Sequence, residues 1–135
     1  MSDQLYQEKI VALAKAKTGA GKLASPTKTA RRDNPLCGDR VIIDVKLDGQ
    51  GKIAEIGHQV RGCLLCQASA SALASVAIGK GAADIAEYRH DAERALGREA
   101  GEPHEPFAVF APVKDHKSRQ DCVLLPFEAL KDALS

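Results

Sequence analysis

Three cysteines and one aspartate are the residues of this 135-residue chain best suited to chemistry. Cys37 and Asp39 lie two positions apart, whereas Cys63 and Cys122 follow at later junctions between predicted elements. Thiolates and carboxylates are ligands of zinc and iron, so these side chains would form a tetrahedral S3O site if the fold brought them together. One such cysteine taken singly is commonly a small buried residue, but packing alone poorly explains three of them beside glycine or charged residues. The sequence therefore predicts a metal or cluster site.

Cys66 is a further candidate ligand, because it lies three residues after Cys63 on nearly the same face of a predicted helix. Three interpretations apply to it: a buried packing residue, a fourth thiolate ligand, or a redox partner of Cys63. The redox interpretation is disfavoured, because that motif normally follows a strand of a βαβ unit and here an antiparallel hairpin is predicted first. Of the four histidines, His116 alone is placed to approach Cys122.

The elements that must position these residues follow from the spacing of apolar side chains. Residues 3–17 predict a helix, and a long polar loop with room for one short edge strand then leads to Cys37. Residues 41–47 and 53–60, joined by a turn, predict an antiparallel hairpin. The remaining elements are helices over 64–79 and 82–97, a loop over 101–106, and a closing helix that begins at or just after Cys122, where Pro126 would lie in its first turn.

This order of elements predicts an α+β fold, in which helices cover a small antiparallel sheet made of the hairpin and that edge strand. The length suits a single domain over residues 1–135 with one core. Aromatic residues make up only 4% of the chain, so alanine and small aliphatic side chains must fill much of this core. Paired carboxylates such as Glu102 and Glu105 lie in a proline-containing loop and do not indicate acid-base catalysis, so a free-standing enzyme is not expected.

Composition and charge exclude several classes of partner. Nineteen basic and eighteen acidic residues leave a formal charge of +1, so no broad positive field attracts nucleic acid. No apolar run reaches the roughly 20 residues needed to cross a bilayer, and the first residues lack the apolar segment of a secretory signal. We therefore expect a cytoplasmic protein with no membrane partner, whose cysteines are ligands, reactive thiols or packing residues rather than disulfides in a reducing environment.

Three segments of the chain resemble a known family. These segments are Asn34-Pro35-Leu36-Cys37-Gly38-Asp39, Arg61-Gly62-Cys63-Leu64-Leu65-Cys66-Gln67-Ala68-Ser69-Ala70-Ser71 and Arg119-Gln120-Asp121-Cys122. Their composition and order resemble the U-type iron-sulfur cluster assembly scaffolds, which include the IscU, SufU and NifU N-terminal types. The resemblance spans nearly the whole chain and implies the NifU N-terminal-like fold.

The resemblance also implies a function and a role for each site residue. A scaffold of this type binds iron, accepts sulfur from a cysteine desulfurase and holds a labile cluster, expected as [2Fe-2S], for transfer to apo-proteins that accept it. Cys37, Cys63 and Cys122 would bind the cluster or Zn²⁺, with Asp39 as the exchangeable oxygen ligand that keeps the cluster labile. Cys122 would be the persulfide acceptor, and two copies of the chain could pair as a homodimer.

Two features of the late segment bear on the subgroup. The long stretch between Cys63 and Cys122 is similar to the SufU type, which implies an alternative: a zinc-bound sulfurtransferase that accepts persulfide on Cys122 and stimulates the desulfurase. Asp121 departs from the histidine or lysine found before this cysteine in the family, so the expected proton donor or extra ligand is absent. The segment 111–114, Ala-Pro-Val-Lys, is similar to the chaperone-recognition motif of IscU types but lies farther from Cys122 than that motif should.

Overall fold

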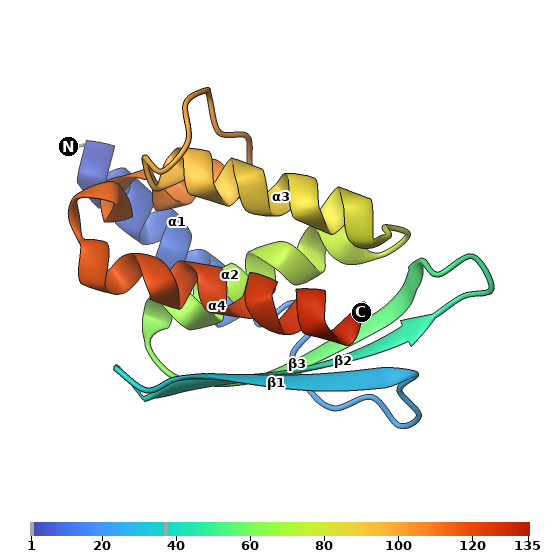
Figure 1. Cartoon of the computed structure of the whole chain (residues 1–135). Coiled ribbons are helices and arrows are strands. Elements are labelled where there is room, and N and C mark those ends of the chain that lie inside the picture. Colours follow the sequence, from blue (N-terminus) through green and yellow to red (C-terminus); the bar gives the residue numbers. More distant parts are fainter. Residues whose placement is uncertain (1, 37) are drawn as a thin grey trace.

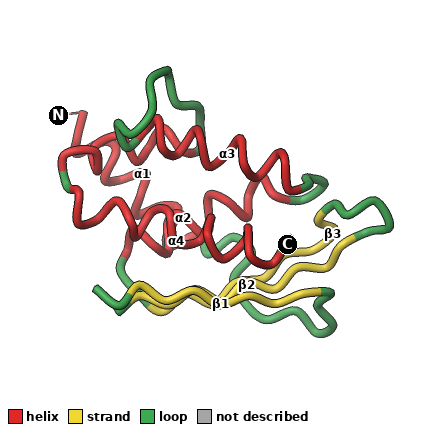
Figure 2. Tube along the Cα trace, in the orientation of Figure 1, coloured by secondary structure: helices red, strands yellow, loops and turns green. Residues whose placement is uncertain are grey.

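The computed structural model of the chain describes residues 2–36 and 38–135, with side chains from residue 8 onward. A three-stranded antiparallel sheet forms one layer, and the helices lie over one of its faces (Figure 1). Figure 2 shows the same division into strands and helices. In chain order the elements are α1 (Ser2–Ala16), β1 (Lys28–Asn34), β2 (Asp39–Leu47), β3 (Ile53–Arg61), α2 (Leu64–Ala77), α3 (Ala82–Ala95), the 3₁₀ helix η1 (Phe107–Asp115) and α4 (Lys117–Ala133).

The central strand β2 pairs with β1 on one side and with β3 on the other. Side chains alternate between the two faces of a strand, and Val41, Ile43 and Val45 point into the core with at most 1% of their surface exposed. Asp39 is the first residue of β2 and lies two positions before Val41, so its side chain points to the same helix-covered face. The predicted hairpin and its buried face are thus confirmed.

Helices α2 and α4 pack directly on the sheet, while α1 packs on α2, and α3 packs on η1 and α4. Small residues line the buried side of α2, as the low aromatic content predicts; they include Ala68, Ala72 and Ala77. Three aromatic rings form a cluster: Phe107 lies 5.7 Å from Tyr88 and 5.3 Å from Phe127 between ring centroids. Within the described part of the chain, every helix is too short or too polar to cross a bilayer.

The segment between α1 and β1 covers part of the sheet. Gly19 and Gly21 exchange backbone hydrogen bonds with His58 at the outer edge of β3. The chain then crosses the sheet face that carries no helices, where Asp44 accepts a hydrogen bond from the Leu23 amide at 3.1 Å. Asp44 is therefore buried on the side of the sheet that was expected to be half-solvated.

The predicted edge strand is confirmed as β1, which is seven residues long. Two other elements differ from the sequence-based expectations. Residues 107–115, which carry the Ala-Pro-Val-Lys segment, form the helix η1 rather than a loop. The closing helix begins at Lys117, not at Cys122, so Pro126 lies well inside α4 and not in its first turn. Pro126 is fully buried there, and its packing in the core offsets the missing N–H donor in that turn.

Candidate metal centre

Asp39 is held in place by a turn and by its position at the start of β2. Gly38 adopts a positive φ of 75°, a conformation that favours glycine, and its amide donates a hydrogen bond to the Asn34 carbonyl at 2.8 Å. The carboxylate of Asp39 is 3% exposed and lies against the backbone of Gly62. A Cβ at position 62 would come within 2.5 Å of Asp39 Oδ1. Gly62 therefore leaves the space that the Asp39 carboxylate occupies.

Cys63 is the N-terminal capping residue of α2, as the sequence predicts. Its backbone amide donates to Asp39 Oδ1 at 3.2 Å, and its thiol approaches Asp39 Oδ2 at 3.6 Å. The N-terminus of a helix carries partial positive charge, which complements the nearby carboxylate of Asp39. The end of β3 and the start of α2 thus present the sulfur of Cys63 directly to the carboxylate.

Cys122 reaches the same place from the second turn of α4. The helix is tied to α2 at the next residue, because the buried Ser69 hydroxyl donates to the Val123 carbonyl at 2.5 Å. Ser69 belongs to the Ala-Ser-Ala-Ser part of α2, so this small polar residue sets how closely α4 approaches α2. The expectation that Cys122 precedes the helix is wrong, but its side chain still faces the sheet end where Asp39 lies.

Asp39, Cys63 and Cys122 each offer a ligand atom, and these atoms all lie within 4.8 Å of one another. In a tetrahedral zinc site, with metal–sulfur distances of about 2.3 Å and metal–oxygen distances of about 2.0–2.2 Å, neighbouring ligand atoms are roughly 3.5–3.8 Å apart. The 3.6 Å between Asp39 Oδ2 and Cys63 Sγ matches this spacing. Two sulfurs and one carboxylate oxygen therefore fit a thiophilic metal ion. Cys37 lies outside the described residues.

The other candidate residues lie elsewhere. Cys66 is fully buried in the core and is absent from the group formed by Asp39, Cys63 and Cys122, which favours its interpretation as a packing residue. Cys63 and Cys66 do not form a disulfide with each other. His116 occupies the N-cap position of α4 without a capping hydrogen bond from its side chain, and it lines a neighbouring pocket, with Leu64 and Arg119 among the other lining residues.

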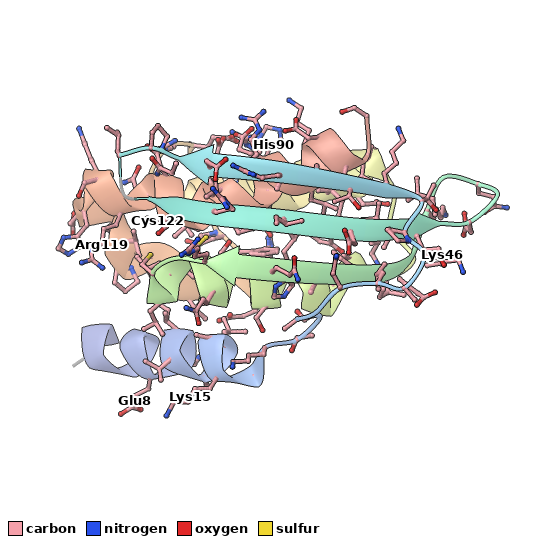
Figure 3. All side chains as sticks on the ribbon, turned by 90° about the horizontal axis from the view of Figure 1, so that it is seen from below. Glu8, Lys15, Lys46, His90, Arg119 and Cys122 are labelled. Carbon is pink, nitrogen blue, oxygen red and sulfur yellow. The ribbon has the colours of Figure 1, made fainter. Side chains whose placement is uncertain are left out.

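A pocket of about 320 Å³ opens over the three candidate ligands. Arg119 lines this pocket one helical turn before Cys122, and the two side chains lie together at the end of the sheet opposite Lys46 (Figure 3). The sequence alone indicates no role for Arg119, because the helix is expected to begin only at or just after Cys122. A helix already formed at residue 119 would have placed Arg119 and Cys122 three residues apart on one face. The rim of the pocket also includes Asn34, Leu36, Ser118 and Asp121.

Comparison with protein families gives one match that covers almost the whole chain. The model described as NifU-like N terminal domain matches residues 5–134. Among curated proteins, the chain is 34% identical over 122 residues to the bifunctional protein NifU/MnmA of Rubrobacter xylanophilus. This alignment covers 84% of the chain but only 25% of the relative, so the chain spans about a quarter of that protein.

Two further comparisons extend over the full length of their relatives. The iron-sulfur cluster assembly scaffold protein IscU of Thermotoga maritima is 28% identical over 132 residues, which cover 96% of the chain and 92% of the relative. A crystal structure described as a putative iron-sulfur cluster assembly scaffold protein for the SUF system, from Fervidobacterium islandicum AW-1, is 32% identical with a TM-score of 0.87 and covers 100% of both chains. The fold predicted from the resemblance is thus confirmed.

Proposed function

The chain belongs to the family of the NifU-like N-terminal domain, and from this membership we propose that it is an iron-sulfur cluster assembly scaffold protein. The convergence of Asp39, Cys63 and Cys122 in one small pocket is the observation that carries the proposal. The names of the full-length relatives support it. In this proposal residues 1–135 form one scaffold domain that works in the cytoplasm.

The proposed ligands of the iron or cluster are Cys37, Asp39, Cys63 and Cys122. The cluster, [2Fe-2S] in this proposal, is cargo: sulfur comes from a cysteine desulfurase, and the assembled cluster passes to apo-proteins. Thiolates bind iron strongly, whereas the carboxylate of Asp39 is a harder and weaker ligand for a cluster. Asp39 is therefore the position at which the thiol of a recipient protein can enter.

Anaerobic reconstitution tests this proposal. The wild-type chain, incubated with ferrous iron, cysteine and a desulfurase, should develop the visible absorption of a cluster with stoichiometric iron and sulfide. Cys63→Ala and Cys122→Ala should lose this absorption, whereas the matched control Cys66→Ala should keep it. Asp39→Ala should retain a cluster but release it more slowly to an apo-ferredoxin. Unchanged absorption in both the Cys63 and the Cys122 variant would show that the site is assigned wrongly.

A second candidate function comes from the resemblance to the SufU type, to which the structure that aligns over the full length of both chains belongs by its description. In this alternative the ligands hold zinc, and the protein relays sulfur. The Cys122 thiolate attacks the terminal sulfur of the desulfurase persulfide; a new S–S bond forms on Cys122, the persulfide S–S bond breaks, and the desulfurase cysteine leaves as a thiolate. The three donor atoms within 4.8 Å suit zinc as well as iron.

Metal analysis of the freshly purified protein separates the two functions. One zinc per chain, with desulfurase turnover that rises on addition of the wild-type protein and not of Cys122→Ser, is the result expected of the sulfurtransferase. A zinc-free chain that takes up and passes on a cluster is the result expected of the scaffold. Cys66→Ser serves as the matched cysteine control in both assays.

A further inference from the structure

Asp121 places a second carboxylate beside the proposed metal ligands. It immediately precedes Cys122 in α4 and lines the same pocket as Asp39 and Cys63. Its oxygens nevertheless do not belong to the group of ligand atoms that lie within 4.8 Å of one another. A divalent ion bound in this pocket would attract the Asp121 carboxylate, so any partner that holds Asp121 elsewhere would affect which ligands the ion receives.

Arg98 supplies a partner for that carboxylate. Its Nη2 donates to Asp121 Oδ1 at 3.3 Å, and its Nε donates to Gln120 Oε1 at 2.7 Å. One guanidinium therefore binds two successive side chains of α4, a fixed fork geometry that lysine cannot reproduce. Arg98 comes from the stretch between α3 and η1, which lengthens the chain between Cys63 and Cys122.

Both ends of this contact are fixed. Gly97 ends α3 with a φ of 75°, and the Arg98 amide donates to the Glu93 carbonyl at 2.9 Å, so the backbone that carries the guanidinium is held. On the other side, the 5% exposed side chain of Gln120 donates to the carbonyls of Leu96 at 3.2 Å and Lys114 at 3.0 Å. The Gln120 amide oxygen and nitrogen thus join the end of α3, the end of η1 and the start of α4.

From this geometry we propose that Arg98 is a positioning residue that keeps the Asp121 carboxylate out of the metal site. The inference rests on the metal site proposed above. It means that the segment after α3, which carries Arg98, determines which side chains can bind the metal. With Asp121 held by Arg98, Asp39 is the one carboxylate among the described residues that reaches the metal. A second carboxylate would add charge and a hard ligand, and would make the metal tighter and slower to exchange.

Titration with Co²⁺, which takes the place of zinc and reports its geometry by visible absorption, tests the proposal. The wild-type chain should show the intense bands of a tetrahedral thiolate site. In Arg98→Met the released carboxylate should bind, so that the bands weaken toward those of a five-coordinate ion and the Kd for Co²⁺ falls by roughly tenfold. Asp121→Asn alone should match the wild type, because its side chain is already held outside the ligand set.

The double variant Arg98→Met/Asp121→Asn decides whether Asp121 is responsible. It loses the same clamp as Arg98→Met but has no carboxylate to offer, so its spectrum and Kd should return to the wild-type values. Arg94→Met is the matched charge control, because Arg94 pairs with Asp91 in α3 at 2.9 Å. Thermal unfolding of each variant checks that the fold is retained.

Each result of this series has a definite meaning. A spectrum and Kd of Arg98→Met equal to the wild type, a double variant that stays like Arg98→Met, or an equal change in Arg94→Met would overturn the positioning role while the metal site stands. A wild-type titration that Cys63→Ala leaves unaltered would instead overturn the metal site itself, and the inference with it.

Discussion

Gly62 shows, at the scale of a single residue, how closely the candidate metal centre is packed. The Asp39 carboxylate occupies the volume that any larger residue at position 62 would need. The Gln67 side chain donates to the Gly62 carbonyl at 3.1 Å and holds the same backbone from the α2 side. The glycine of the Arg-Gly-Cys segment therefore belongs to the site although it offers no ligand atom.

Gly62→Ala should weaken metal binding. The new Cβ would lie 2.5 Å from Asp39 Oδ1 and 2.6 Å from its Cγ, so the carboxylate must move away from Cys63. We expect a roughly tenfold higher Kd for zinc and a loss of about 1–3 kcal/mol in the free energy of unfolding. Competition with a zinc chelator and urea denaturation measure the two quantities. Gly49→Ala is the control, because its Cβ would meet nothing within 4 Å. Equal affinities in all three proteins would contradict the packing argument.

Cys66→Ala should separate packing from metal binding. Because the Cys66 side chain is fully buried, its truncation should cost about 1 kcal/mol of unfolding free energy and leave metal stoichiometry unchanged. Cys63→Ala should behave in the opposite way, since Cys63 is only partly buried and lies beside Asp39. Chelator titration and chemical denaturation of both variants give the comparison. A loss of metal from Cys66→Ala would make Cys66 a ligand.

At the scale of elements, the approach of α4 to α2 decides whether Cys122 meets its partners. Pro126 donates no backbone hydrogen bond inside α4, and the Ser69 hydroxyl donates to the carbonyl of Val123 three residues earlier. Both side chains are buried where the two helices meet. The contact between Ser69 and Val123 therefore fixes α4 one residue after the proposed ligand.

Ser69→Ala should destabilise the protein by roughly 1–3 kcal/mol, because it leaves a buried carbonyl without its side-chain donor. Ser75→Ala is the matched control in the same helix. The Ser75 hydroxyl donates to the Ala72 carbonyl of its own helix, and the residue is exposed. Its replacement should change stability by no more than about 0.5 kcal/mol. Thermal unfolding should therefore show a lower Tm for the Ser69 variant only; equal Tm values would refute the role of this contact.

The sequence predicts the elements that bury one face, because their apolar residues then recur with the period of a strand or a helix. β2 alternates because one of its faces is covered, and α2 is rich in small residues because it lies close to its neighbours. β1 has no such pattern, since its residues, Lys-Thr-Ala-Arg-Arg-Asp-Asn, are mostly exposed and the strand forms through pairing with β2. The start of α4 was placed too late because Pro126 was expected in a first turn, whereas tertiary packing accommodates it deeper in the helix.

The same distinction applies to the candidate site. Asp39, Cys63 and Cys122 could be identified from residue type and from their place at or near the ends of elements, and the fold brings them together. Arg119 and Arg98 could not be identified in this way. The role of Arg119 depends on where α4 begins. The role of Arg98 depends on how the end of α3 packs against α4. Arg98 is 22 positions from Gln120 and 23 positions from Asp121, so no local sequence pattern encodes these contacts.

At the scale of the whole molecule, His58 joins the first third of the chain to the core. Its Nε2 donates to the Thr18 carbonyl at 2.7 Å, and its backbone pairs with Gly19 and Gly21. Nδ1 has no hydrogen-bond partner among the described residues. Burial lowers the pKa of His58, although the bond to Thr18 acts in the opposite direction. The neutral imidazole is therefore the form that fits the folded protein.

This pKa shift predicts an acid-sensitive stability. The folded-state pKa of His58 lies below its unfolded value of about 6.5, so the contribution to stability is full above pH 6.5 and declines as the pH falls toward the folded-state pKa. The slope should reach up to about 1.4 kcal/mol per pH unit. Urea denaturation between pH 5 and 8 should show this slope in the wild type and a flatter one in His58→Gln. Equal slopes would contradict the assignment.

His90 offers a control of opposite sign. Its hydrogen bond to Glu99 raises the pKa of the His90 imidazole, so any contribution to stability is present below about pH 6.5 and is lost as the pH rises through the raised value. Because the pair lies at the surface, the effect should be small and should diminish with salt. His90→Gln should therefore leave the slope of the acid limb of the stability curve as it is in the wild type.

The edges of the sheet have a consequence for behaviour at high concentration. β3 is shielded at its outer edge by Gly19 and Gly21, whereas β1 presents Arg31, Arg32 and Asp33 along its open edge. Charged edges resist strand addition from other molecules, which is the route to fibrils. Any chain that docked here by strand addition would have to accommodate these charges and displace ion pairs such as Arg31–Asp33. The polar composition of β1, which gives the strand no apolar alternation of its own, is thus what protects the molecule from polymerising through its sheet.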